Sequence, residues 1–183
     1  MFSLMRNKLI KGLVLACLTF LSFQATAHDI INSHSHKDKI KHDPNISFYT
    51  GMFDFSDDGK KAALIGMQHQ NENLFRDSFL GKISPITGTM LTENNSLFLY
   101  TGIQAEYDLG KIKFTPSFTP GYYYEGDGKD LGYPLEFKSE LQLSLDISES
   151  SNFGLSYNHI SNASLGDKNP GANSYMFNFL KRF

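Results

Sequence analysis

Strict alternation of apolar and polar side chains over the fifteen residues from Tyr133 to Ile147 constrains the fold of this chain more than any other feature. The odd-numbered positions are Tyr, Leu, Phe, Ser, Leu, Leu, Leu and Ile, whereas the even-numbered ones are Pro, Glu, Lys, Glu, Gln, Ser and Asp. A period of two is typical of a β-strand, because a helix would mix both sets on every face. Fifteen residues exceed the usual length of strands in soluble proteins. The pattern therefore favours a strand that crosses a membrane.

Seven further segments predict strands along the rest of the chain. The regular ones are 97–109, 112–124, 152–161 and 173–183, and the less distinct ones are 46–55, 62–70 and 79–90, where Pro85 interrupts the pattern. The last segment carries aromatic residues at alternate positions from Tyr175 on, except Lys181, and ends on Phe183, which is typical of the assembly signal of bacterial outer-membrane barrels.

These segments predict an all-β fold, an eight-stranded antiparallel transmembrane β-barrel of the bacterial outer membrane that spans residues 45–183. The links at Gly110 and 148–151 are short, and those at 125–132 and 162–172 are long and rich in Gly and Asp. Short links are expected on the periplasmic side and long ones outside. The alternative is a soluble β-barrel with a ligand cavity, which explains the alternation but neither the strand lengths nor the terminal Phe.

Residues 1–27 have the pattern of a secretory signal peptide, with a basic start, an apolar stretch from Gly12 to Phe23 and a cleavage site after Ala27. A lipoprotein signal ending at Cys17 is the weaker alternative, because it leaves a very short apolar core. Removing three cationic residues from the 17 Lys and Arg leaves 14 against 19 Asp and Glu, a net charge of −5. That charge argues against a nucleic-acid partner. The single cysteine leaves with the signal, so the mature chain forms no disulfide.

Residues 28–44 form a polar, His-rich N-terminal segment with His28, His34, His36 and His42. Histidines spaced in this way can bind a transition metal. A solvated segment is the favoured interpretation, because no matching cluster of ligands follows in the sequence. We expect no metal and no cofactor.

His159 and Ser161 are the residues that best fit catalytic chemistry. They are two positions apart and therefore project from one face of their strand, the face that also carries Phe153, Leu155 and Tyr157. On a membrane barrel this face points toward lipid, where polar groups are costly unless they are partnered or functional. Asn173 has the same parity on the next strand and is expected opposite His159. Ser161 is then a candidate nucleophile, His159 its base and Asn173 the residue that orients the imidazole.

A longer run of residues around this pair resembles the PagL-type lipid A 3-O-deacylases. The resemblance lies in Glu125-Gly-Asp-Gly-Lys-Asp130, Leu131-Gly-Tyr-Pro-Leu-Glu-Phe137 and His159-Ile-Ser-Asn-Ala-Ser-Leu-Gly-Asp-Lys-Asn-Pro-Gly171. It implies a metal-independent serine esterase in an outer-membrane barrel, which removes the acyl chain at the 3-position of lipid A in lipopolysaccharide. The resemblance also leaves a homodimer open.

The resemblance maps the family's catalytic His and Ser onto His159 and Ser161, but the acidic third member falls at Asn173. An amide oxygen can still accept the imidazole N–H, as in Cys-His-Asn proteases, although it supplies no negative charge. We therefore expect slower chemistry, or Asp167 as a substitute third member. Asn162, which follows the nucleophile, is a candidate for oxyanion binding or support.

The competing function is a non-catalytic outer-membrane barrel, structural or adhesin-like, with a decayed His-Ser pair. Two other features carry less weight. The Gly126–Asp130 loop is a candidate cation site, although external loops are commonly rich in Gly and Asp. His69 stands alone and is expected to be structural.

Overall fold

The structure is a computed structural model that describes residues 45–71, 76–78 and 81–182. The predicted signal peptide and the His-rich segment lie outside the described residues. No helix in the described ranges is long and apolar enough to cross a membrane. The described part is built from strands, which are β1 (Asn45–Phe53), β2 (Ala62–Gln70), β3 (Arg76–Ser78), β4 (Gly81–Thr92), β5 (Leu97–Leu109), β6 (Ile112–Tyr124), β7 (Leu135–Ser148), β8 (Ser151–Ser161) and β9 (Ala172–Arg182).

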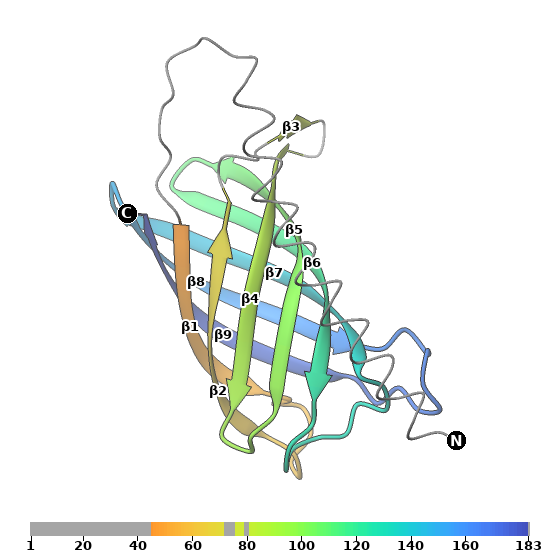
Figure 1. Cartoon of the computed structure of the whole chain (residues 1–183). Helices are drawn as coiled ribbons and strands as arrows, with labels where there is room; N and C mark the ends of the chain where they lie inside the picture. Colours follow the sequence, from red (N-terminus) through yellow and green to blue (C-terminus); the bar gives the residue numbers. More distant parts are fainter. Residues whose placement is uncertain (1–44, 72–75, 79–80, 183) are drawn as a thin grey trace. The chain divides into compact units, whose positions relative to one another are not determined.

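The strands form one closed antiparallel sheet. Neighbours in the sheet follow the order β2-β1-β9-β8-β7-β6-β5-β4, and pairing of β2 with β4 closes the ring. The short β3 pairs with β4 beyond the end of β2, so β2 and β3 share one position of the ring. The result is the predicted eight-stranded β-barrel, which is visible in Figure 1 as strands curving around a common axis.

The segment predicted near 79–90, where Pro85 interrupts the pattern, forms the continuous strand β4. Pro85 lies inside β4, in register with Ile103 of β5. On the other side of β4, pairing with β2 ends at Ile86 and pairing with β3 begins at Ile83. Proline lacks an N–H, and it lies at the gap between two partner strands, where its carbonyl oxygen accepts a hydrogen bond from the Asn71 N–H at 3.1 Å.

The two faces of the sheet differ as the alternation predicts. Large apolar side chains are exposed on the outer face, whereas the inner face is buried and largely polar. Lys138 and Glu140 form a buried ion pair inside the barrel, with 2.6 Å between Nζ and Oε2. The Lys138 ammonium also lies 4.0 Å from the ring centroid of Tyr100, whose hydroxyl is 3.0 Å from that of Tyr49. These contacts partner the buried charges, which would otherwise be costly in a dry interior.

The connections group at two ends of the barrel. One end carries the turns at 110–111 and 149–150 together with the start of β1 and the end of β9. The other end carries the connections 54–61, 93–96, 125–134 and 162–171. We refer to the latter as the loop end, and it is the end at which the predicted catalytic residues lie.

Candidate active site

His159 and Asn173 lie opposite each other on β8 and β9, near the loop end. Along β8 the odd-numbered residues are exposed or half-buried and the even-numbered ones buried after Ser151, because successive side chains point to opposite faces of the sheet. His159 is therefore on the outside of the barrel wall, next to the exposed ring of Tyr157. The structure brings these two residues together as the sequence predicts.

A hydrogen bond links His159 Nδ1 to Asn173 Oδ1 at 2.8 Å. The hydroxyl of Tyr157 donates to the same oxygen, also at 2.8 Å. With the amide oxygen as acceptor, the neutral imidazole carries its hydrogen on Nδ1, and Nε2 keeps its lone pair. This is the tautomer that a general base toward serine requires.

Ser161 shares the outer face with His159 and is half-buried at the end of β8. Within the described part of the chain, its hydroxyl makes no hydrogen bond and is not joined to the imidazole. Its neighbour across the strand pair is Phe137, whose ring stacks on Phe118 with 5.9 Å between centroids. The serine therefore lies beside an apolar aromatic surface on the outside of the barrel.

Gly171 leaves the space beside the imidazole open. A Cβ at this position would lie 2.9 Å from His159 Cε1 and 3.4 Å from Nε2. Its φ of +62° is also one that residues with a side chain rarely adopt. The glycine therefore serves both the turn into β9 and access to the basic nitrogen.

Asn162 is fully buried and points inward, because its even position places it on the other face of the strand. Its amide donates to the carbonyl oxygens of Leu131 and Lys168, both at 2.8 Å, and its own oxygen accepts the Ser164 N–H. Its backbone N–H donates to Asn169 Oδ1 at 3.1 Å. These bonds leave no amide hydrogen for an oxyanion, so the geometry favours the support role for Asn162.

Asp167, the alternative third member, is exposed on the 162–171 connection. Among the described residues it has no hydrogen bond and no ion pair, whereas Asn173 is bonded to the imidazole. The geometry therefore favours Asn173.

Ion pairs and hydrogen bonds join the connections at the loop end. Lys129 pairs with the buried carboxylate of Asp54 at 2.5 Å and with Asp57 at 3.3 Å. Lys168 pairs with Asp130 at 2.6 Å. The Lys168 ammonium and the Gly132 N–H hold the pKa of the Asp130 carboxyl below its usual value. Hydrogen bonds from the Gly59 N–H and Lys129 do the same for the pKa of Asp57.

The candidate cation loop, Gly126–Asp130, takes part in this network. Asp127 accepts a hydrogen bond from the Asn95 amide at 3.0 Å, and both Lys129 and Asp130 have partners on other connections. No group of three His, Cys, Asp or Glu side chains within the described ranges is arranged to hold a metal. The loop thus connects neighbouring turns of the barrel.

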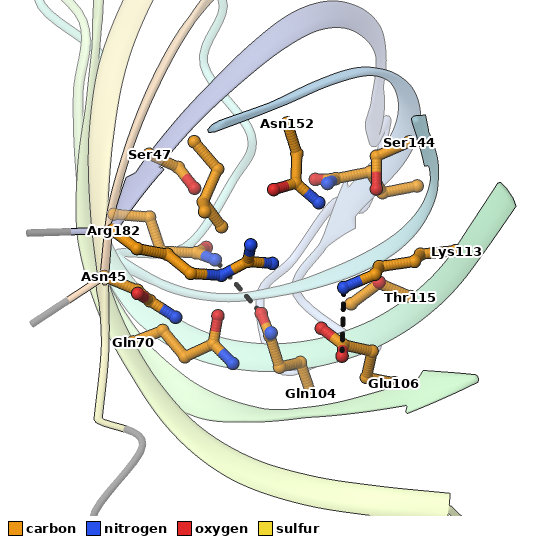
Figure 2. A pocket seen from close by; sticks show the side chains of 13 residues that line it. Asn45, Ser47, Gln70, Gln104, Glu106, Lys113, Thr115, Ser144, Asn152 and Arg182 are labelled. Atoms are coloured by element: carbon orange, nitrogen blue, oxygen red, sulfur yellow. Dashed lines mark hydrogen bonds and ion pairs between the residues drawn. The ribbon is translucent and has the colours of Figure 1, made fainter. Parts of the chain in front are cut away.

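A separate polar cavity lies inside the barrel, toward the end opposite the loop end (Figure 2). Asn45, Gln70 and Gln104 line it, together with the ion-paired Glu106 and Lys113 and with Arg182 at the end of β9. His159 and Ser161 do not line this cavity, because they face outward. The cavity is therefore distinct from the candidate active site.

Four residues around the site were not predicted from the sequence: Asp54, Ser56, Tyr157 and Gly171. Tyr157 has the parity of His159, so its proximity was accessible from the alternation. Asp54 and Ser56 lie more than a hundred positions before Asn173, which they contact. No local pattern indicates such a contact, because it depends on the conformation of the 54–61 turn.

The family model described as "Lipid A 3-O-deacylase (PagL)" matches residues 44–182. The crystal structure of the outer membrane enzyme PagL is similar, with 18% identity, a TM-score of 0.57, and coverage of 76% of this chain and 99% of that chain. The outer membrane protein Ail of Yersinia pestis aligns at 11% identity, with a TM-score of 0.48 and coverage of 78% and 100%. No curated protein sequence matches the chain.

Proposed function

The chain belongs to the lipid A 3-O-deacylase family, and from this membership we propose that it hydrolyses the ester at the 3-position of lipid A with Ser161 as nucleophile. His159 is the general base, and Asn173 orients its imidazole. The observation that carries the proposal is the 2.8 Å hydrogen bond between His159 Nδ1 and Asn173 Oδ1, made on the outer wall of the barrel. It fixes the tautomer whose Nε2 can accept a proton.

In the proposed reaction, Ser161 Oγ attacks the ester carbonyl carbon and its proton passes to His159 Nε2. The tetrahedral intermediate then collapses, the bond to the sugar oxygen breaks, and the proton moves from Nε2 to that oxygen. Water next attacks the acyl-enzyme with His159 again as base, which releases the fatty acid and restores Ser161. A free serine hydroxyl is a weak nucleophile, so each attack depends on this base.

The bound ester is expected to complete the link between Ser161 and His159. Hydrogen bonds of catalytic groups are often long in the absence of substrate and tighten in the complex. Both side chains are on one face of β8, and Gly171 leaves Nε2 accessible. The Ser161 hydroxyl therefore has to approach the imidazole when the substrate binds.

The proposed location is the bacterial outer membrane, with the loop end in the outer leaflet. The exposed apolar side chains of the outer face fit a lipid environment, and the aromatic surface of Phe137 and Phe118 beside Ser161 fits an acyl chain. Lipid A would then reach Ser161 laterally through the membrane. This route is consistent with catalytic residues on the outside of the barrel.

Mass spectrometry of lipid A from cells that express the protein tests the proposal. We expect the loss of one ester-linked acyl chain in cells with the wild-type protein, and Ser161→Ala to lower the rate at least ~1,000-fold. Ser139→Ala is the matched control, because Ser139 is an exposed serine opposite His159 on β7. We expect this variant to retain activity.

Two outcomes would overturn the proposal. Loss of activity in Ser139→Ala with retention in Ser161→Ala would mean that the nucleophile is misassigned. Unchanged lipid A in cells with a folded wild-type barrel would favour the non-catalytic barrel, for which the amide at position 173 in place of an acid is the specific observation.

A further inference from the structure

The turn after β1 contacts Asn173 through three consecutive residues. Asp54 Oδ1 accepts the backbone N–H of Asn173 at 3.3 Å. The N–H of Phe55 donates to the Asn173 carbonyl oxygen at 2.9 Å. Ser56 Oγ accepts a hydrogen bond from Asn173 Nδ2 at 3.2 Å. Asp54, Phe55 and Ser56 thus engage both backbone polar groups and the amide nitrogen of Asn173, while Oδ1 faces the imidazole.

The turn is itself firmly anchored. The Asp54 side chain is 1% exposed and its other carboxylate oxygen pairs with Lys129 at 2.5 Å. The backbone of Asp54 has a φ of +50°, which turns the chain at the end of β1. The Phe55 ring lies 6.2 Å from that of Tyr157 and 5.6 Å from that of Tyr175. Residues 54–56 are therefore held against the start of β9 by charge, by hydrogen bonds and by aromatic contact.

We propose that residues 54–56 are a positioning segment of the active site, which directs the oxygen of the Asn173 amide toward His159. The inference rests on the proposed function of His159 as a base. An amide has one accepting and one donating end, whereas a carboxylate accepts at both oxygens. A third member that is an amide therefore needs a device that sets its orientation.

The orientation of the amide decides the tautomer of the imidazole. With Oδ1 toward His159, Nδ1 carries the hydrogen and Nε2 is free to accept the serine proton. With Nδ2 toward His159, Nδ1 must accept, so Nε2 carries the hydrogen and cannot act as a base. An Asn that imposes the wrong tautomer is known to cost a serine protease roughly 10⁴-fold in kcat. In the observed orientation the amide nitrogen donates to Ser56 Oγ at 3.2 Å. The amide oxygen accepts from the Tyr157 hydroxyl and faces His159 Nδ1, both at 2.8 Å.

The kinetic test compares Ser56 variants in two backgrounds, the wild-type chain and Asn173→Asp. In the wild-type chain we expect Ser56→Ala to lower kcat about tenfold, the effect of losing one hydrogen bond, with little change in KM. Ser56→Thr keeps a hydroxyl and is expected to restore most of the rate. With Asn173→Asp, both oxygens accept, so Ser56→Ala should change kcat less than about twofold.

Ser148→Ala is the matched control for loss of an exposed serine hydroxyl. Ser148 Oγ accepts the Ser150 N–H at 3.4 Å in the turn between β7 and β8, at the opposite end of the barrel. The Ser148→Ala variant should have the kcat of the wild type. An equal loss of kcat from Ser56→Ala in both backgrounds would mean a general structural effect and would overturn the inference. An unchanged kcat in Ser56→Ala would overturn it as well.

Nitrogen-15 NMR of histidine-labelled protein supplies a readout that does not depend on turnover. His159 is assigned by comparison with His159→Gln. We expect the Nδ1–H tautomer in the wild type and a substantial share of the Nε2–H tautomer in Ser56→Ala. A tautomer that is the same in both would contradict the positioning role. Failure of the proposed function would give a different result: lipid A would stay intact, while the His159 tautomer would still differ between the wild type and Ser56→Ala.

Discussion

Asn173, the proposed third catalytic residue, presents an amide at a position where an acid would stabilise the protonated imidazole of the proposed reaction. Asp has the same shape as Asn and would keep the contact with His159 Nδ1, which is 2.8 Å in the wild type, while adding a negative charge. We expect Asn173→Asp to raise kcat at least about tenfold, because the charge stabilises the imidazolium that forms during attack.

The control for this substitution is Asn173→Ala, which removes the acceptor and should fall below the wild-type rate. Both rates are measured on purified, folded barrels with lipid A in detergent, as release of the fatty acid. A rate for Asn173→Asp at or below that of the wild type, with the barrel intact, would show that charge at this position does not limit the reaction.

The positions of individual site residues could be predicted only where they follow from the alternation of apolar and polar side chains. The outward position of His159 and Ser161 follows from the apolar side chains that share their parity, and antiparallel pairing suggested Asn173 as the partner. The alternation also places the even-numbered Asn162 inside the barrel, away from the outward face on which an oxyanion would form. Ser56 was out of reach of the sequence, because its contact requires the positive φ of Asp54 and the docking of a turn from the other end of the chain.

Two glycines in turns at opposite ends of the barrel, Gly171 and Gly110, allow a test of whether access to the imidazole matters. Gly171 and Gly110 both have positive φ, +62° and +81°, but a Cβ on Gly171 would meet His159 while one on Gly110 would meet nothing within 4 Å. We expect Gly171→Ala to lower kcat about 100-fold by displacing the imidazole. Gly110→Ala should cost only about 1 kcal/mol of stability, as backbone strain.

Steady-state rates and unfolding midpoints of the two glycine variants distinguish access from strain. Equal rates for the two variants, at equal folded fractions, would mean that the open space beside His159 is not needed for the reaction.

The positions of the strands could be predicted from the sequence, since β2, β5 and β6 have the predicted bounds. The short β3 and the continuous β4 were not, because they depend on which partner strand faces Pro85.

In the barrel, contacts that stabilise the fold lie on the inner face of the sheet, whereas the proposed chemistry takes place on the outer face. The buried pair of Lys138 and Glu140 is on the inner face of β7, whereas His159 and Ser161, the proposed catalytic residues, are on the outer face of β8. Replacing Lys138 by Met leaves a buried carboxylate without its cation, which typically costs about 3 to 5 kcal/mol. The double variant Lys138→Met with Glu140→Gln removes both charges and should recover most of that loss.

Unfolding in urea, followed by circular dichroism because the chain has no tryptophan, measures these differences. At temperatures well below the unfolding midpoint, the folded fraction of Lys138→Met should keep the wild-type kcat, since its interior change does not reach His159 directly. A large fall in kcat per folded molecule would mean that the interior packing of β7 sets the position of β8, and hence that the two faces are coupled. Comparing the loss of unfolding free energy with the change in kcat per folded molecule therefore decides whether the barrel wall is a rigid support for the outward-facing site.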